Sequence, residues 1–163
     1  MNTVFLLTGG NLGERFLNLQ LAKQLIQQSC GIIVRESSVY KTAAWGFTEQ
    51  PDFYNQALEL QTNFSPQELM LALLSIEENM GRKRAVKLGP RIIDIDILLM
   101  NDLIIKSPAV TIPHPHLHER RFALTPLAEI APDAIHPVLH TSVKQLLAEC
   151  RDDLPVYKIL TDN

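Results

Sequence analysis

Two aspartates stand two positions apart in the apolar segment "GPRIIDIDILLM", residues 89–100. Side chains alternate along a strand, so Asp94 and Asp96 would share one face while the isoleucines beside them take the other. Their Cα atoms would lie ~6.6 Å apart, where two carboxylates repel by ~2.5 kcal/mol at an effective dielectric constant of about 20. Carboxylate oxygens suit Mg²⁺, and two ions ~3.5–4 Å apart could lie between this pair and a phosphate chain. The spacing favours a magnesium site, with an amphipathic strand whose acidic face meets water as the alternative.

Basic residues gather just before the aspartates. Arg91 opens the same segment, and "GRKR" at 81–84 precedes it together with Lys87. Cations beside a carboxylate pair make chemical sense if a polyphosphate binds, because metal ions can hold one side of the phosphate chain and guanidinium groups the other. The cluster therefore predicts a polyphosphate ligand.

A histidine-rich segment, "IPHPHLHERRF", occupies residues 112–122. Its alternate histidines invite a zinc interpretation, but a proline interrupts them and the usual zinc-ligand spacing is missing. We favour His114, which lies between two prolines, as one imidazole fixed against a ligand. Arg120 and Arg121 follow, and either of them could point into a site.

The segment "TGGNLG", residues 8–13, follows one apolar run and precedes another. It resembles a phosphate cradle but matches neither the dinucleotide-binding nor the Walker pattern. We favour a turn in which Asn11, with Glu14 three residues later, caps a helix. Close approach of the glycine backbone to a pocket is the alternative.

The expected elements follow the order β-α-β-β-α-β, which is ferredoxin-like and predicts an α+β fold with an antiparallel sheet and two helices on one face. The first helix should run from Asn11 to about Ser29, with an apolar face at Leu17, Leu21 and Leu25. The second should begin at Ser65-Pro66. The other expected elements are strands at 2–8, 32–42, 54–62, 91–100 and 156–159, and short helices at 120–130 and 142–150. The connections 43–53 and 81–91 are long, which is typical of functional loops, and both border strand ends near one edge of the sheet.

The 163 residues suit a single domain, 1–163, with 46% hydrophobic and 20% charged residues. A net charge of −3 and a pI of 5.9 give no global positive field for nucleic acid or anionic lipid. No apolar run reaches the ~18 residues that span a bilayer, and the first ten residues do not read as a signal peptide. Two unpaired cysteines are typical of a reducing compartment, so we expect a cytoplasmic protein.

Several of these segments resemble the 6-hydroxymethyl-7,8-dihydropterin pyrophosphokinase family. "GPRIIDIDILL" looks like the family motif G-P-R-x-x-D-x-D-I-L, and "IPHPHLHERRFALTPLAEIAP" looks like a second long motif. "TGGNLG" and "QPDFYNQALEL" are similar to two further blocks, and the resemblance runs in order from about residue 3 to residue 137.

The resemblance implies a ferredoxin-like monomer that transfers the pyrophosphoryl group of ATP to a pterin hydroxymethyl and releases AMP, in tetrahydrofolate biosynthesis. Its ligands would be small molecules. Asp94 and Asp96 would bind two Mg²⁺ ions, and Arg82 and Arg91 would contact the transferring group. ATP would contact Glu77, Arg84, Ile97, His114 and Arg120. The pterin would contact Thr42, Ala43, Trp45, Phe53, Asn55 and Phe122.

Four positions depart from the family pattern. Gly10 stands where Ser is usual, Ala43 where Pro is frequent, Trp45 where an aliphatic residue is common, and Leu88 where some members have Trp. These positions bear on loop closure and pterin affinity rather than on the chemistry.

Two other classes of protein remain as alternatives. A metal-dependent nucleotidyltransferase or phosphoesterase could use the same aspartates and arginines, but a nucleotidyltransferase would release pyrophosphate where a pyrophosphokinase releases AMP. A ferredoxin-like RNA-binding or regulatory module would need sheet-face aromatics and a basic surface, which this sequence offers in small measure.

Overall fold

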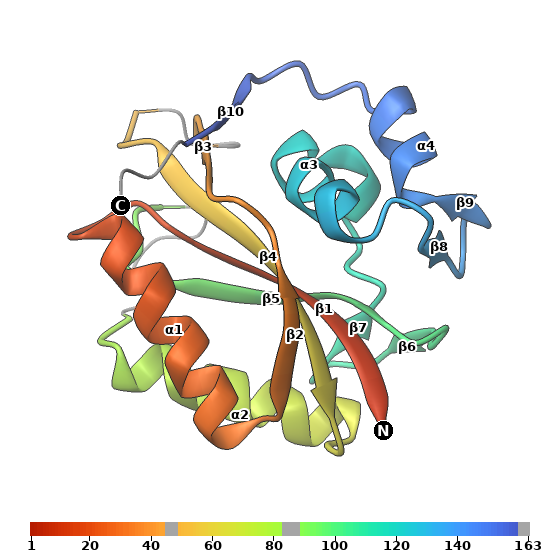
Figure 1. Cartoon of the computed structure of the whole chain (residues 1–163), viewed down its shortest axis with the longest axis horizontal. Helices are drawn as coiled ribbons and strands as arrows, with labels where there is room; N and C mark the ends of the chain where they lie inside the picture. The colour runs from red at the N-terminus through yellow and green to blue at the C-terminus, as the bar shows by residue number, and fades with distance from the viewer. Residues whose placement is uncertain (45–48, 83–88, 160–163) are drawn as a thin grey trace.

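The computed structural model describes residues 1–44, 49–82 and 89–159. A six-stranded antiparallel sheet lies at its centre, in the order β10-β3-β4-β1-β5, with β2 also paired to β4 (Figure 1). Its strands are β1 (Asn2–Gly10), β2 (Ile32–Glu36), β3 (Tyr40–Thr42), β4 (Phe53–Thr62), β5 (Asp94–Met100) and β10 (Val156–Lys158). Two small hairpins are β6 (Ile105–Lys106) with β7 (Thr111–Ile112), and β8 (Ile135–His136) with β9 (Thr141–Ser142).

Helices cover both faces of the sheet (Figure 1). α1 (Arg15–Ser29) and α2 (Pro66–Asn79) pack on one face, where their buried leucines and isoleucines form the larger core with β1, β4 and β5. α3 (Arg121–Ile130) and α4 (Val143–Glu149) form a smaller core on the other face, and the 3-10 turn Leu117–Glu119 precedes α3. The α+β fold and the antiparallel sheet with two helices on one face are confirmed. Within the described residues, no helix has the length and apolar character needed to cross a membrane.

The two helix starts predicted from capping patterns had different outcomes. The start of α2 is confirmed, because Ser65 Oγ accepts a hydrogen bond from Glu68 N and Glu68 Oε1 accepts one from Ser65 N. The predicted start of the first helix at Asn11 was wrong. α1 begins at Arg15, and Glu14 at its N-cap makes no side-chain capping bond. Asn11 cannot cap it because its amide is bonded to other segments of the chain.

The predicted apolar face of α1 was wrong at two of its three positions. Leu25 packs against the core, but Leu17 and Leu21 are 58% and 43% exposed. The buried residues that face the sheet are Leu19, Ala22 and Ile26. Both rows of residues have helical spacing, so periodicity alone could not rank them. Packing of the neighbouring strands and α2 decides which row is covered.

Two of the predicted strands differ from the structure by more than two residues. The segment expected as one strand at 32–42 is divided into β2 and β3, which pair with opposite ends of β4. Ser37 lies at the break, where its backbone N donates to Ala57 O and its Oγ accepts from Ala57 N. The strand expected from residue 91 begins at Asp94, since the Arg91 backbone is bonded to Asn11 and Leu12 instead of to a strand ladder.

His136 in β8 gives the fold a predicted sensitivity to acid. Its Nδ1 accepts hydrogen bonds from Val138 N at 3.2 Å and Leu139 N at 3.1 Å. Burial lowers the pKa of His136 below its usual value, and the neighbouring His118 and His140 lower it further. The unfolded chain therefore takes up the proton at higher pH than the folded protein, so the free energy of unfolding should fall as pH drops below about 6.5.

Thermal denaturation at about pH 7.5 and about pH 5.5 would measure this effect. We expect His136→Asn to show a smaller loss of melting temperature between the two conditions than the wild type. His140→Asn is the comparison variant: residue 140 has a φ of 53°, which asparagine tolerates, and most of the wild-type loss should remain because burial of His136 is the larger cause of its lowered pKa. An unchanged loss in His136→Asn would assign the acid sensitivity elsewhere.

Candidate active site

An open cleft lies where the ends of β1, β4 and β5 approach the start of α3. It collects side chains that are distant in the sequence, from the first strand to the histidine-rich segment. The lining residues are Leu7, Gly9, Thr42, Ala43, Phe53, Asn55, Arg91, Asp94, Asp96, Arg120 and Phe122. One end of the cleft, at β5, thus carries both acidic and basic side chains. The other end, at β3 and β4, is neutral and partly aromatic.

The acidic pair lies on the cleft side of β5, and the isoleucines between and beside the two aspartates are buried on the opposite side. Asp94 stands opposite Gly9 and Asp96 opposite Leu7 in the β1–β5 ladder. The Asp94 and Asp96 side chains remain 26% and 28% exposed, so both can meet a ligand. This is the shared face that the alternation predicted.

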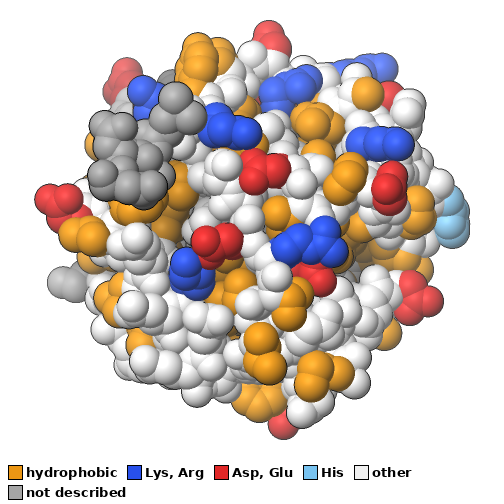
Figure 2. Space-filling model, in the orientation of Figure 1, with side chains coloured by type: hydrophobic (Ala, Val, Ile, Leu, Met, Phe, Trp, Pro, Cys, Tyr) orange, Lys and Arg blue, Asp and Glu red, His pale blue; other side chains and the backbone are white. Residues whose placement is uncertain are grey.

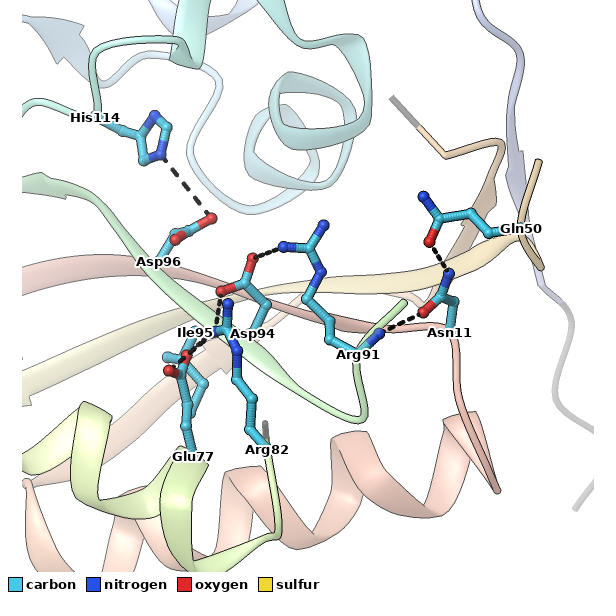
Figure 3. Close-up of polar contacts among 9 residues, drawn as sticks. All are labelled: Asn11, Gln50, Glu77, Arg82, Arg91, Asp94, Ile95, Asp96 and His114. Carbon is cyan, nitrogen blue, oxygen red and sulfur yellow. Dashed lines mark hydrogen bonds and ion pairs between the residues drawn. The ribbon is translucent and has the colours of Figure 1, made fainter. Parts of the chain in front are cut away.

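The two aspartates have different electrostatic surroundings (Figure 3). Asp94 is paired with two cations: its Oδ1 lies 2.7 Å from Arg82 Nη1 and its Oδ2 lies 3.6 Å from Arg91 Nη1. Among the described residues, Asp96 makes a looser contact, 4.0 Å from its Oδ2 to His114 Nε2. Withdrawal from water and the charge of Asp94 raise the pKa of Asp96, against the opposing effect of Arg120. An added cation would therefore be favoured most at Asp96.

His114 presents a neutral imidazole to Asp96. Its Nδ1 accepts a hydrogen bond from His116 N at 3.1 Å, so the ring proton is assigned to Nε2, the atom nearest Asp96. Burial and the charge of Arg120 lower the pKa of His114 to about 4. The group can therefore donate a hydrogen bond to an anion at neutral pH without adding positive charge.

The chemistry of this end fits magnesium better than zinc. Among the residues that the structure describes, no group of three or more His, Cys, Asp or Glu could hold a metal ion. His116 and His118 instead contact Glu119, at 2.9 Å and 3.5 Å. Mg²⁺ usually takes one or two carboxylates and completes its shell with phosphate oxygens and water, so two aspartates are a sufficient protein contribution.

Arg82 and Glu77 form the wall behind the aspartates. Glu77 on α2 is only 2% exposed; its Oε2 accepts from Ile95 N at 2.7 Å, and its Oε1 lies 3.0 Å from Arg82 Nη1. The same guanidinium nitrogen contacts Asp94. Arg82 is therefore held between α2 and β5 by two carboxylates, outside the lining of the cleft (Figure 3).

Two arginines reach the cleft itself. The Arg91 guanidinium lies 5.0 Å from the ring centre of Phe53, and the Arg120 guanidinium lies 5.6 Å from that of Phe122. Arg91 Nε has no hydrogen-bond acceptor among the described residues, so it offers an oriented donor to an anion. Of the two adjacent arginines, Arg120 lines the cleft, whereas Arg121 donates to Cys150 O and Asp152 O in the C-terminal segment.

The neutral end of the cleft is built around a buried amide. Asn55 on β4 and Thr42 on β3 are each 3% exposed, and Asn55 Nδ2 donates to Thr42 Oγ1 at 3.0 Å. Gly9 makes room for this amide, since a Cβ there would lie 2.4 Å from Asn55 Oδ1. The pair offers donors and acceptors inside an apolar frame that includes Phe53 and Phe122, which suits a flat, polar-edged heterocycle.

Comparisons with known proteins identify a family that matches most of this chain. The sequence profile of the family described as 7,8-dihydro-6-hydroxymethylpterin-pyrophosphokinase (HPPK) matches residues 5–132. This chain belongs to the HPPK family.

Relatives and solved structures of the HPPK family support the match. The chain is 40% identical over 149 residues to a 2-amino-4-hydroxy-6-hydroxymethyldihydropteridine pyrophosphokinase of Aquifex aeolicus, covering 91% of this chain and 92% of that protein. It is 40% identical over 145 residues to a folic acid synthesis protein of Dictyostelium discoideum, covering 89% of this chain but only 22% of that protein. The crystal structure of Plasmodium falciparum HPPK-DHPS with SDX-DHP has a TM-score of 0.72 at 18% identity, covering 91% and 43% of the two chains, and shows a shared fold.

The predicted site residues of this HPPK family member fall into four groups. Those that line the cleft are Asp94, Asp96, Arg91, Arg120, Thr42, Ala43, Phe53, Asn55 and Phe122. Arg82, Glu77 and His114 contact the aspartates or their strand from the side. Ile97 is 2% exposed within the core under α2, and its side chain does not line the cleft. The predictions for Arg84 and Trp45, and the departure at Leu88, lie outside the described residues.

Leu7 and Asn11 have places at or beside the cleft that the sequence did not assign, whereas Gly9 lines the cleft, as the alternative for the glycine segment expected. Leu7 could have been found only from the pairing register of β1 with β5. In the view of Figure 2, acidic and basic side chains are interspersed across the visible face of the molecule. An anionic ligand would therefore be attracted by the arginines that line the cleft and not by a broad positive field.

Proposed function

We propose that the cleft binds ATP at its charged end and 6-hydroxymethyl-7,8-dihydropterin at its neutral end, and performs the HPPK reaction of tetrahydrofolate biosynthesis. The pyrophosphoryl group of ATP passes to the hydroxymethyl oxygen of the pterin, and AMP is released. The observation that carries this assignment is the presence, in one cleft, of an acidic pair flanked by arginines and of a buried asparagine amide. Residues 1–163 would act as one domain, in keeping with the coverage of 92% of the Aquifex aeolicus relative.

The charged end would receive the triphosphate. Asp94 and Asp96 would hold Mg²⁺, two ions by the family's pattern, and Arg91 and Arg120 would contact phosphate oxygens from the other side. When bound, the metal would neutralise phosphate charge and lower the pKa of the pterin hydroxyl. His114 Nε2–H adds a neutral donor whose orientation is already fixed by its Nδ1 hydrogen bond. In phosphoryl transfer, positioning and charge neutralisation dominate, so we assign no general base.

The neutral end would hold the pterin. Asn55 and Thr42 would bond its polar edge, because both are buried and each keeps hydrogen-bonding capacity beyond their mutual bond. Phe122 and Phe53 would contact its faces or edges, and Ala43 would lie beside it.

Asn55→Ala is expected to weaken pterin binding by ~1–3 kcal/mol, the cost of a buried polar partner left unpaired. The affinity for a nonhydrolysable ATP analogue should not change, because Asn55 is on the other end of the cleft from the aspartates. Calorimetric titration of each ligand would measure both effects. Asn18→Ala is the matched control, since the Asn18 amide bonds only the local Leu12 O. Unchanged pterin affinity would remove Asn55 from the site.

The reaction itself is tested by its products. Incubation with ATP, Mg²⁺ and 6-hydroxymethyl-7,8-dihydropterin should yield AMP and the pterin pyrophosphate in equal amounts. Release of pyrophosphate with the nucleotide joined to the acceptor would instead assign nucleotidyl transfer, and ADP would assign transfer of a single phosphoryl group.

A further inference from the structure

The chain after α4 continues past the start of α3 and ends as β10 beside β3 (Figure 1). Both α3 and β3 contribute to the neutral end of the cleft, through Phe122 on α3 and Thr42 on β3. The family match ends at residue 132, so residues 150–158 lie beyond it. We call residues 150–158 the C-terminal strap, because they are bonded to both elements.

Arg121 and Asp152 attach the strap to the start of α3. Arg121 Nε donates to Asp152 O at 2.8 Å, and Arg121 Nη2 donates to Cys150 O at 3.0 Å. Asp152 Oδ2 accepts from Arg121 N at 3.1 Å, in the first turn of the helix, where backbone N–H groups have no partner within the helix. The residues on either side of Arg121, Arg120 and Phe122, line the cleft. The strap therefore holds the part of α3 that faces the ligands.

β10 attaches the strap to β3. Val156 stands opposite Thr42 in the antiparallel ladder, and Ile159 N, which follows the strap, donates to Val39 O at 2.8 Å. β4 pairs with the other edge of β3, so the strap is bonded to its outer edge. The two attachments are close in the chain, since three residues separate Asp152 from Val156.

Asp152 also shapes the short link between the two attachments. Its Oδ1 accepts from Leu154 N at 3.1 Å, while its Oδ2 is bonded to the start of α3. Pro155 follows, and its ring fixes the backbone φ angle. A short link that is bonded within itself keeps the two attachments at a fixed separation.

The far end of α3 has separate attachments. Tyr40 Oη donates to Glu129 Oε1 at 2.5 Å, and Arg35 Nη1 donates to Ile130 O at 2.7 Å. Loss of the strap contacts would therefore free the start of the helix while its far end stays in place. Such a movement would change the position of Phe122 at the neutral end of the cleft.

We propose that Arg121 and Asp152 are positioning residues that set the place of Phe122 at the neutral end and thereby the affinity for the pterin. Neither residue is among the described residues that line the cleft, so both act through α3. The strap gives them this effect because its other end is bonded to β3, so the start of α3 keeps a fixed distance from Thr42. This inference rests on the proposed function and assigns two further residues to it.

Arg121→Ala and Asp152→Ala should each weaken pterin binding roughly 3- to 10-fold, the loss expected for one hydrogen bond of ordinary net strength. KM for the pterin should rise by a similar factor. The kcat at saturating pterin should stay close to the wild-type value, since the altered contact serves ground state and transition state alike. Calorimetric titration and steady-state rates would measure these effects. Asp152→Asn should keep part of the affinity, because its amide oxygen can still accept from Arg121 N.

Arg35→Ala is the matched control. Arg35 also donates to a backbone carbonyl at an end of α3, but at the end remote from the cleft, and it is not among the described residues that line the cleft. We expect Arg35→Ala to lower the melting temperature and to leave the pterin affinity unchanged. An equal loss of affinity in Arg35→Ala and Arg121→Ala would indicate a general loss of packing and overturn the positioning role.

Hydrogen exchange in the ligand-free protein tests the attachment without the pterin. Asp152→Ala should speed the exchange of the backbone amides of residues 122–124, because the start of α3 opens more often, and Arg35→Ala should not. Unchanged exchange at residues 122–124 in Asp152→Ala would overturn the inference, whatever ligand the protein binds.

The outcomes separate this inference from the proposed function. Lower melting temperatures with wild-type pterin affinity in both Arg121→Ala and Asp152→Ala would leave the strap a purely structural role and overturn the inference. A wild-type protein that binds the pterin but forms no AMP would overturn the proposed function and leave the affinity comparison valid. If the alanine variants do not fold, Arg121→Lys and Asp152→Asn provide the same comparison, with smaller losses of affinity expected.

Discussion

Asp96→Ala should lower AMP formation by about 10³-fold or more and remove Mg²⁺-dependent ATP binding, while the protein stays folded. The large loss follows from the placement of Asp96: it faces the cleft and, within the described residues, has no ion pair with arginine such as Asp94 has. Burial and the charge of Asp94 raise the pKa of Asp96, so a cation bound at this carboxylate is favoured. Removing the carboxylate relieves repulsion from Asp94 and Glu77, so stability should be unchanged or increased.

Turnover, nucleotide titration with and without Mg²⁺, and the melting temperature together measure this prediction. Asp102→Ala is the matched control, because Asp102 is an exposed carboxylate in the turn that follows β5. Asp96→Asn should lose activity to a similar extent, since an amide has the shape but not the charge of the carboxylate. Wild-type magnesium dependence in Asp96→Ala would refute the metal role.

The acidic pair could be predicted because its geometry is local. Alternation along one strand places Asp94 and Asp96 on one face and Ile95 on the other, whatever the strand pairs with. The Ser65–Glu68 capping box was predictable for the same reason, as both of its hydrogen bonds lie within four residues.

Asn11 shows where a local pattern fails. Asparagine with a glutamate three residues later reads as a helix start, and nothing within that window argues otherwise. The partners that the amide bonds lie 39 to 80 residues away, at Gln50, Pro51 and Arg91. Only the pairing of β1 with β4 and β5 brings them to Asn11, and strand register is not written in any single segment.

The choice between Arg120 and Arg121 was likewise decided by tertiary contacts. Both precede the body of α3 and have the same chemistry, but the C-terminal segment supplies backbone carbonyl acceptors to Arg121 alone. Arg120 is left on the cleft side. The sequence could therefore identify the chemistry of the site and most of its residues, and the fold was needed to assign a direction to each side chain.

Arg82→Ala should lower kcat by about 10²- to 10³-fold, the loss typical when one oriented electrostatic partner of a transition state is removed. We predict that the affinity for Mg²⁺ and the ATP analogue stays unchanged or rises. Arg82 Nη1 lies 2.7 Å from Asp94 Oδ1 and 3.0 Å from Glu77 Oε1, so its guanidinium would compete with a metal ion for this Asp94 oxygen. Loss of this cation frees Asp94 for Mg²⁺ and also removes the charge that would reach the transferring group.

Single-turnover rates and calorimetric titration of the nucleotide would separate the two effects. Guanidinium ion added to the Arg82→Ala variant should restore part of the lost rate. The same addition should restore less in Arg82→Lys, because the lysine ammonium already occupies the place of the guanidinium but lacks its planar fork of donors. Arg15→Ala is the matched control: Arg15 bonds Asp52 O and stacks on Tyr54, without contact to the acidic pair. If both kcat and nucleotide affinity were unchanged, Arg82 would serve only to hold Glu77 and Asp94 together. If nucleotide affinity fell and kcat did not, Arg82 would contact the nucleotide in the ground state.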